Sequence, residues 1–356
     1  MSSTLPCRLR RQFYHAKALY RILENERVSA EAILRAIYKE GTKDLEEGER
    51  LVCVDISLIK KPYSKALEGL HFVGPEKVPG YELITCLGLD KEGNISLGYA
   101  HLVSHREKCF KSMPDEVRRG IEEAAVNLKR GNSCLIYVCD RGFDDRKVFE
   151  KVTELDESFV IRVYKDRKFD GGRKLKEVSD SIAPLERYTA KMKVRGSYCD
   201  VLIYFGYTHV SIGGTKLTLV VSRVPALKNR GRWLLLTNLP VNSPEEAKRV
   251  VEIYRKRWTV EEFFRLLKAG LGLEEFQVEK LSHIRKIIAI LLGLAIFLYK
   301  VKMEESPFKE LLLDLGGRLG IKSERNGPYL LIRGFIRLLN YEVTREELLK
   351  AEGMKI

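Results

Sequence analysis

The sequence lacks the features that would assign it to a disulfide-stabilised, secreted or membrane class. Its seven cysteines are an odd number without a C-x-x-C pair, which argues against a disulfide framework and structural zinc and favours a reducing compartment. Cys53, Cys86, Cys134 and Cys139 lie in apolar runs, and we expect them to be buried thiols. The N-terminal residues contain no apolar signal core. The longest apolar run, 287–299, is too short for a bilayer and predicts a buried helix.

Several common site motifs are missing as well. The chain has no H-E-x-x-H, no P-loop and no G-x-G-x-x-G, and it shows neither an internal repeat nor a low-complexity tract. His101 and His105 are four residues apart, but we expect them on a strand and in its following loop. That placement argues against shared metal ligation.

Basic residues are what the chain has in excess. Among its 356 residues, 63 are Lys or Arg and 49 are Asp or Glu, which gives a net charge of +14. Such an excess favours a polyanionic partner, and nucleic acid comes first. An anionic membrane surface is the competitor, but no convincing basic amphipathic anchor supports it. The length of 356 residues predicts two or three structural units, and the 45% share of hydrophobic residues predicts a globular chain.

The order of predicted elements divides the chain into five segments. They are a helical, basic N-terminal region for DNA binding (1–48), the first part of an α/β core (49–165), a β-rich antiparallel insertion (166–242), the second part of the core (243–300) and a helical C-terminal region (301–356). The first 21 residues hold five basic residues and no acid, which suits either a DNA contact or an ordinary solvated helix. Within the first core segment the predicted order is β-β-β-α-β-α-β.

One predicted helix carries an unusual polar stripe. Ser243 is its expected N-cap, Pro244 its first residue and Glu246 the partner in a capping box, and Gly270 and Gly272 are expected to end it near residue 269. Its segment "YRKRWTVEEFFRLLK" places four polar side chains on a stripe roughly 60° wide beside an apolar face. These four residues are Tyr254, Arg257, Glu261 and Lys268. Taken alone, an i,i+4 salt bridge between Arg257 and Glu261 is the simpler interpretation.

Two acids on predicted core strands change that balance. Asp55 interrupts the apolar strand "LVCVDISLI", and Asp140 closes "CLIYVCD", at the carboxyl end of a strand where sites on open α/β sheets gather. Isolated carboxylates there are costly unless cations pair with them. Together with Glu261 on a helix packed against the same sheet, they would suit two Mg²⁺ or Mn²⁺ ions that catalyse phosphoryl transfer.

The spacing Y-x₂-R-x₃-E-x₆-K resembles the Y-R-E-K signature of bacterial DDE transposases of the insertion sequence four family. "VCVDIS" resembles the strand of that family with the first Asp, although Ile56 stands where Ser or Thr is common, and "VCDRGFDD" resembles the segment with the second Asp. The resemblance covers roughly residues 50–300, and the chain aligns with no family pattern beyond about residue 300. It implies an α/β fold with a ribonuclease-H-like core, a mixed sheet flanked by helices, and an insertion between the second Asp and the Glu.

The resemblance also implies roles for particular residues. Asp55, Asp140 and Glu261 would be the catalytic triad that binds two Mg²⁺ ions, with Mn²⁺ as a substitute. The remaining residues would contact DNA, Trp233 by stacking on a flipped base. They are Tyr254, Arg257, Lys268, Trp233, Arg162 and, next to Arg257, Trp258. Without the resemblance, a half-buried strand residue is the preferred interpretation of Trp233, and packing in the core is the alternative for Trp258.

The implied function is cut-and-paste transposition in a prokaryotic cytoplasm, at the nucleoid. Its partners would be the terminal inverted repeats and target DNA, bound by a homodimer in a synaptic complex, without a membrane. The 3′-hydroxyl freed by metal-dependent cleavage would form a hairpin that is reopened before strand transfer. Two alternatives stay open: a ribonuclease-H-like nuclease without strand transfer, and a DNA-binding protein derived from a transposase.

Overall fold

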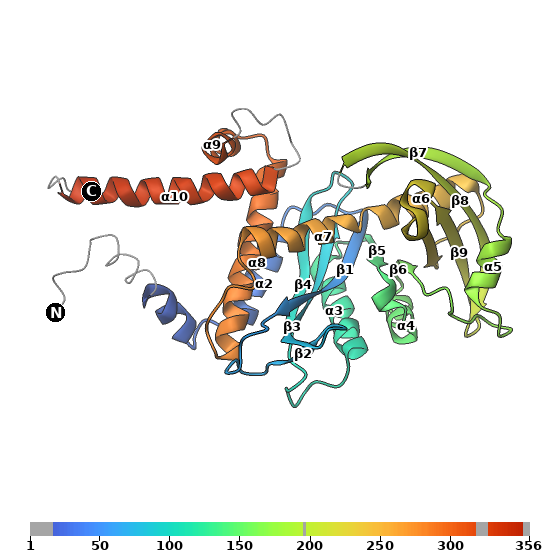
Figure 1. The fold of residues 1–356 in the computed structure, drawn as a ribbon, viewed down its shortest axis with the longest axis horizontal. Helices are drawn as coiled ribbons and strands as arrows, with labels where there is room; N and C mark the ends of the chain where they lie inside the picture. The colour runs from blue at the N-terminus through green and yellow to red at the C-terminus, as the bar shows by residue number, and fades with distance from the viewer. Residues whose placement is uncertain (1–16, 195–196, 318–326, 352–356) are drawn as a thin grey trace.

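The computed structural model describes residues 17–194, 197–317 and 327–351 (Figure 1). Residues 1–16, which hold most of the predicted basic N-terminal helix, lie outside the described residues. The strands of the described chain are β1 (Glu49–Lys60), β2 (His71–Val73), β3 (Val78–Leu89), β4 (Ile95–Val103), β5 (Cys134–Cys139), β6 (Ser158–Arg162), β7 (Glu186–Val194), β8 (Ser197–Ile212), β9 (Thr215–Arg223) and β10 (Arg232–Thr237).

The helices of the described chain fall close to the predicted segments. They are α2 (Ala30–Thr42), α3 (Met113–Leu128), α4 (Arg146–Glu154), α5 (Leu175–Ser181), α6 (Pro244–Arg255), α7 (Trp258–Arg265), α8 (Leu281–Met303), α9 (Pro307–Gly316) and α10 (Gly327–Ala351), with short helical turns η1 (Arg141–Phe143), η2 (Pro225–Arg230) and η3 (Leu266–Gly270). The predicted β-β-β-α-β-α-β order of the first core segment is therefore confirmed, with β2 as an additional short strand.

All ten strands belong to one mixed sheet. Its first half has the order β4-β3-β1-β5-β6, in which β3 is antiparallel to both β1 and β4, while β5 is parallel to both β1 and β6. This order is consistent with the ribonuclease-H-like core that the resemblance implies. The predicted antiparallel insertion continues the same sheet, because β10 pairs with β6 and is followed by β9, β8 and β7.

Helices cover both faces of the sheet. Alternate strand residues point to opposite faces, so Cys53 belongs to one hydrophobic core and its neighbour Val54 to the other. The core around Val54 is closed by α3 and α4, whereas the core around Cys53 is closed by α6, α7 and α8. Figure 1 shows α6 and α7 following one another across the strands. Asp55 has the same parity as Cys53 and therefore faces α7.

Helix α8 contains the longest apolar run and extends beyond it on both sides. By length and composition α8 could cross a membrane, which corrects the expectation that this segment is too short. Half of its most apolar stretch is nevertheless buried inside the fold, as in the core helix of a globular domain. Fully buried side chains such as Ile284 and Leu298 pack into the core that faces α7. The prediction of a buried helix is therefore confirmed for half of that stretch.

Two further details differ from the sequence predictions. Ser243 is the N-cap of α6 as expected, since its side chain accepts a hydrogen bond from the Glu246 backbone N–H. The Glu246 carboxylate, however, reaches back to the Asn242 N–H at 2.6 Å and not to Ser243, so the capping box is one residue longer. Cys53, Cys86 and Cys139 are buried, but Cys134 is exposed, because it is the first residue of β5, at the edge of the core.

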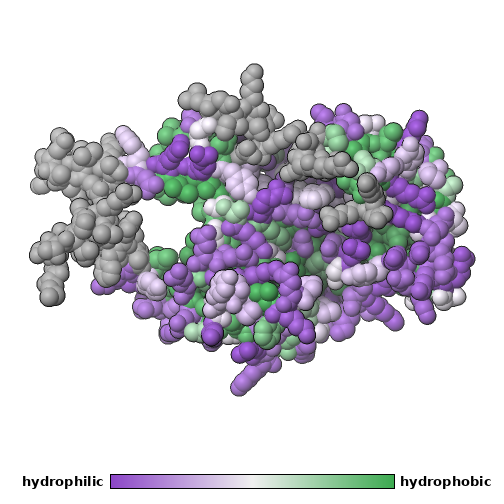
Figure 2. Space-filling model, viewed as in Figure 1, coloured by the Kyte–Doolittle hydropathy of each residue, from purple (hydrophilic) through white to green (hydrophobic). Residues whose placement is uncertain are grey.

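Hydrophilic residues cover much of the described surface in the view of Figure 2. A hydrophobic area lies over α9 and α10. The exposed hydrophobic side chains of these two helices include Leu311, Ile336 and Leu339. The positively charged chain therefore presents both polar surface and a limited apolar region among its C-terminal helices.

Candidate active site

Asp55 and Asp140 are neighbours across two parallel strands. The β1–β5 register ends at the pair Val54–Cys139, so the two acids are the next residues on adjacent strands about 4.8 Å apart. Asp140 caps the turn η1, where its Oδ1 accepts the Gly142 N–H at 2.7 Å. A Cβ on Gly142 would lie 3.1 Å from that oxygen, which makes glycine the residue that best suits this turn.

The environment of Asp55 disfavours its negative charge. Burial raises the pKa of Asp55 to about 6, and the charges of Asp140 and Glu261 act in the same direction. Arg257 and the Ile56 N–H, which Asp55 Oδ1 accepts at 2.8 Å, oppose that rise. Asp140 and Glu261 are therefore close enough to repel Asp55, and a cation among the three carboxylates would relieve the repulsion.

Arg257 supplies positive charge between two of these acids. Its Nη1 lies 3.3 Å from Asp55 Oδ2, and its Nη2 donates a hydrogen bond to Glu261 Oε1. Burial disfavours the guanidinium charge, but Tyr254, Glu261 and Asp55 raise the pKa of Arg257 above its ordinary value. The simple i,i+4 salt bridge therefore exists, and it is extended by a third partner from β1.

The helix that carries the polar stripe is not continuous, which corrects the prediction of one helix from 243 to about 269. It is divided into α6, α7 and η3. The Arg257 N–H bonds to the Tyr254 carbonyl and the Val260 N–H to the Arg257 carbonyl, which is the tighter 3₁₀ pattern. Further on, Leu271 N–H bonds to the Leu266 carbonyl, a π pattern often found at functional sites. The predicted end at Gly270 is confirmed.

The break changes what the stripe residues contact. Tyr254 is only 4% exposed and packs edge-on against Trp233, with ring centroids 5.2 Å apart. Burial raises the pKa of the Tyr254 phenol, while Arg257 and Arg162 oppose that rise and Asp140 adds to it. Tyr254 and Arg162 therefore lie beside the acids. Trp233 is buried beneath them and is not open to a base in this conformation.

Lys268 and Trp258 lie apart from the three acids. Lys268 Nζ donates to the Leu58 carbonyl at 2.5 Å and lies 3.3 Å from Glu274, three residues along β1 from Asp55. Trp258 is 51% exposed, so the alternative that it packs in the core is wrong. In this conformation the Lys268 ammonium is held by the Leu58 carbonyl and Glu274, whereas the Trp258 side chain is open to solvent.

The residues at the centre fit a hard divalent cation. Three carboxylates and no nitrogen or sulfur ligand form the donor set, which is the set that Mg²⁺ and Mn²⁺ prefer. The guanidinium of Arg257 holds the place of a cation between Asp55 and Glu261. Within the described residues the three acids are not drawn together to mutual ligand distance.

A buried ion pair that the sequence analysis missed supports the loop after Asp140. Asp144 accepts hydrogen bonds from the Tyr164 N–H at 2.8 Å and from Arg167 Nε. Arg167 also donates to the Asp144 carbonyl at 2.9 Å. These bonds tie the loop after β5 to the segment after β6. The repeated acids in "CDRGFDD" were a signal, but the partner Arg167 is 23 residues away and could not be assigned from spacing.

Two comparisons with known proteins give a family and a similar solved structure. The sequence model of the family described as Transposase DDE domain matches residues 48–298, well over half of the chain. Among solved structures, the chain is similar to a piggyBac transposase in a synaptic complex with hairpin DNA, with 13% sequence identity and a TM-score of 0.43. That match covers 83% of this chain and 54% of the other, so this chain spans about half the length of that protein.

Proposed function

This chain belongs to the family of transposase DDE domains, and from that premise we propose that it is a cut-and-paste DNA transposase of the insertion sequence four type. It would cleave DNA at the ends of a mobile element, form and reopen a hairpin at each end, and join the freed 3′ ends to target DNA. Every one of these steps is an attack of water or a hydroxyl on phosphorus, so a single set of acids can serve them all.

The observation that carries the proposal is the convergence of Asp55, Asp140 and Glu261. Two of them follow paired residues on adjacent parallel strands, and the third comes from the helix packed on the same face. Asp55 is desolvated and repelled by the other two acids. A structural ion pair between Arg257 and Glu261 alone would not require a second and third acid at this place.

We assign Asp55, Asp140 and Glu261 as the residues that would hold two Mg²⁺ ions, or Mn²⁺ in their place. When bound, the ions would activate the attacking oxygen and stabilise charge on the leaving oxygen. Arg257 would have to turn away from Asp55 and Glu261 as the cations enter. Its freed guanidinium would then be available to a DNA phosphate, since the bidentate fork of arginine suits such oxygens.

The remaining site residues are proposed to contact DNA around the cleaved bond. Tyr254 and Arg162 lie beside the acids, and Lys268 and Trp258 at the rim. Trp233 would stack on a flipped base, and this requires Tyr254 to move, because Tyr254 packs against it now. The partners would be double-stranded terminal repeats and target DNA, bound by a homodimer in the prokaryotic cytoplasm. The net charge of +14 supports a polyanionic partner.

Cleavage of a labelled duplex that carries the DNA flanking this gene would test the proposal. We expect cuts at a defined end in Mg²⁺ and none in EDTA, and we expect hairpins among the products on a denaturing gel. Pre-cleaved ends offered with a plasmid target should yield joined products. Cutting without joining would favour the nuclease alternative, and tight binding without any cutting would favour the transposase-derived DNA-binding protein.

A further inference from the structure

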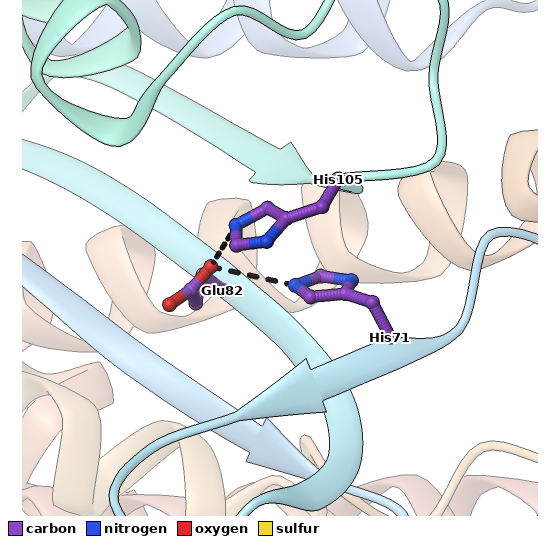
Figure 3. Close-up of side chains that lie close together, drawn as sticks. All are labelled: His71, Glu82 and His105. Atoms are coloured by element: carbon purple, nitrogen blue, oxygen red, sulfur yellow. Dashed lines mark hydrogen bonds and ion pairs between the residues drawn. The ribbon is translucent and has the colours of Figure 1, made fainter.

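Two histidines and a glutamate meet at a corner of the sheet away from the acids. His71 lies on β2, Glu82 on β3, and His105 in the loop that follows β4 (Figure 3). The strands β2 and β4 both pair with β3, β2 at its start and β4 along most of its length. Three segments that are 11 to 34 residues apart in the sequence thus bring their side chains to one point.

The three side chains aim their ligand atoms at one another. His105 Nε2 lies 2.7 Å and His71 Nε2 lies 3.4 Å from the same oxygen, Glu82 Oε2. One ligand atom from each residue lies within 4.8 Å of the others. Neighbouring ligands of a tetrahedral zinc ion lie about 3.4 Å apart, because each bond is about 2.0–2.2 Å long. The 2.7 Å contact would lengthen through a small rotation of His105, whose side chain is 34% exposed.

Hydrogen bonding at His71 leaves a place for a cation. Its Nδ1 lies 3.4 Å from the Gly69 carbonyl and its Nε2 lies 3.4 Å from Glu82 Oε2, so both neighbours are acceptors. A neutral imidazole has only one N–H. If that proton is on Nδ1, it faces the Gly69 carbonyl, and the lone pair of Nε2 then faces the Glu82 carboxylate. This contact is repulsive. It becomes favourable when a metal ion lies between the two atoms. A backbone carbonyl on the other ring nitrogen is the usual outer support of a metal-binding histidine.

The surroundings hold this arrangement in place. The His71 side chain is 7% exposed and that of Glu82 is 15% exposed. The rings of His71 and His105 are stacked at 4.0 Å, and Phe110 stacks on the outer side of His105 at 4.2 Å. Ser104 Oγ donates to the same Gly69 carbonyl at 2.6 Å and so fixes the acceptor that faces His71. The ring orientations are therefore supported independently of any ion.

We propose that His71, Glu82 and His105 form a second metal site that binds a zinc-class divalent cation and clamps β2 and the loop after β4 to the edge of the sheet. Two imidazoles and one carboxylate suit Zn²⁺ or a similar first-row ion and do not suit Mg²⁺, which prefers oxygen ligands. Three protein ligands leave a fourth position for water, on the partly exposed side of His105.

The site is separate from the three acids. Glu82 pairs with Leu58 and Thr85 pairs with Asp55 in the β1–β3 register. Positions three apart on a strand point to opposite faces, so Glu82 and Asp55 lie on opposite sides of the sheet. A cation at His71, Glu82 and His105 would thus act on the structure of the sheet edge and not on the chemistry at Asp55.

Calorimetric titration of ZnCl₂ into the chelator-stripped full chain, in excess Mg²⁺ to occupy the acids, would test the proposal. We expect one zinc ion per chain. The affinity should fall at least about 100-fold in His71→Gln, Glu82→Gln and His105→Gln. Zinc should also raise the Tm of the wild type and leave that of His105→Gln unchanged. His105 is the safest of the three to replace, since it lies in a loop and is partly exposed.

Two controls make the result decisive. His209→Gln replaces an exposed histidine on β8, and Glu261→Gln removes one of the three acids; both should bind zinc like the wild type. The exposed thiols Cys109, Cys134 and Cys199 are present in every variant and cancel from the comparison. Zinc affinity that is equal in the wild type and His105→Gln would overturn the proposal, as would absence of zinc binding. The cluster would then be a carboxylate shared by two imidazoles.

Discussion

The two faces of one sheet hold two clusters that differ in their ligand atoms. On the face of α7, Asp55, Asp140 and Glu261 offer only oxygen atoms, and Arg257 bridges two of them. On the other face, His71 and His105 offer nitrogen atoms beside the single carboxylate of Glu82. The two clusters are close along β1, because Glu82 pairs with Leu58, which is three residues from Asp55.

The comparison shows how strand alternation keeps two chemistries apart. Neighbouring positions on a strand face opposite sides of the sheet. Two polar clusters can therefore lie a few residues apart along one strand and still be separated by the sheet. The donor atoms then select the ion, oxygen for Mg²⁺ or Mn²⁺ and nitrogen with oxygen for zinc-class ions. Substitutions that remove one cluster and leave the other intact therefore test this separation.

The largest effect is expected from Glu261→Gln. This change keeps the size of the side chain and its bond with Arg257 but removes a proposed metal ligand, so DNA cleavage in Mg²⁺ should fall at least about 1,000-fold, or about 4 kcal/mol. DNA binding should remain. The neighbouring exposed Glu262→Gln is the matched control and should cut normally. Single-turnover rates on the labelled duplex would measure both, and an active Glu261→Gln would remove Glu261 from the site.

Next in size is the loss of the bridging cation in Arg257→Ala. Removing one partner of a largely buried ion pair costs about 3–5 kcal/mol, and Asp55 and Glu261 would then repel each other. We expect a free energy of unfolding lower by about 3 kcal/mol in EDTA, with partial recovery in Mg²⁺, which would take over the place of the guanidinium. Urea unfolding measures this.

The control for Arg257→Ala is Lys256→Ala, which replaces an exposed cation in the same turn. Its effect should stay within about 0.5 kcal/mol. If Mg²⁺ raised the stability of Arg257→Ala no more than that of Lys256→Ala, the exchange of guanidinium for metal would be wrong.

A smaller effect concerns pH. The pKa of Asp55 is raised from its ordinary value of 3.8 to about 6, so its contribution to stability is favourable below about pH 4 and is lost as the pH rises through 6. The difference is on the order of 3 kcal/mol. Asp55→Asn removes this penalty, so in EDTA the variant should gain stability relative to the wild type between pH 4 and pH 8. A stability difference that does not change with pH would contradict the raised pKa.

The smallest stability effect is expected at the start of α6. Ser243→Ala removes the side chain that accepts the Glu246 N–H, and loss of such a cap typically costs about 1 kcal/mol. Because this end of α6 is far along the chain from Arg257, cleavage in Mg²⁺ should be unchanged. Thermal unfolding and the cleavage assay would check the two parts. A loss of cleavage comparable to that of Glu261→Gln would show that α6 positions the site.

No effect at all on cleavage is expected from His105→Gln at low temperature. The variant lies on the opposite face from the acids and should differ from the wild type only in zinc-dependent stability. Cleavage rates in Mg²⁺ with and without added zinc would show this. A parallel loss of zinc binding and of cleavage would join the two clusters into one functional unit.

The parts of the site that depend on strand register could be predicted from the sequence. Asp55 and Asp140 sit at the same level on adjacent parallel strands because each follows a continuous apolar run. Such a run can be recognised in the sequence as a buried strand. Ser243 could be predicted because capping is local. The break at Arg257 could not be predicted from the sequence. The residues around it contact Asp55 on β1 and Trp233, which lie far away in the sequence.

The histidine cluster shows the same limit. Spacing offered only His101 as a neighbour of His105, and it argued against shared metal ligation by the two. The partners of His105 are His71 and Glu82, brought together by the pairing of β2 and β4 with β3. Likewise, nothing in the residues of β10 indicates that it joins β6 and extends the core sheet rather than forming a separate insertion. Tertiary pairing, and not local preference, decides each of these features.

The central claim is that Asp55, Asp140 and Glu261 jointly hold the metal ions that cut DNA. Replacing Asp140 by Cys tests it most directly, because a thiolate is a poor ligand for Mg²⁺ and a better one for Mn²⁺. We predict that Asp140→Cys is inactive in Mg²⁺ and regains cleavage at the same position in Mn²⁺. Cleavage by Asp140→Cys in Mg²⁺ at the wild-type rate would contradict the claim.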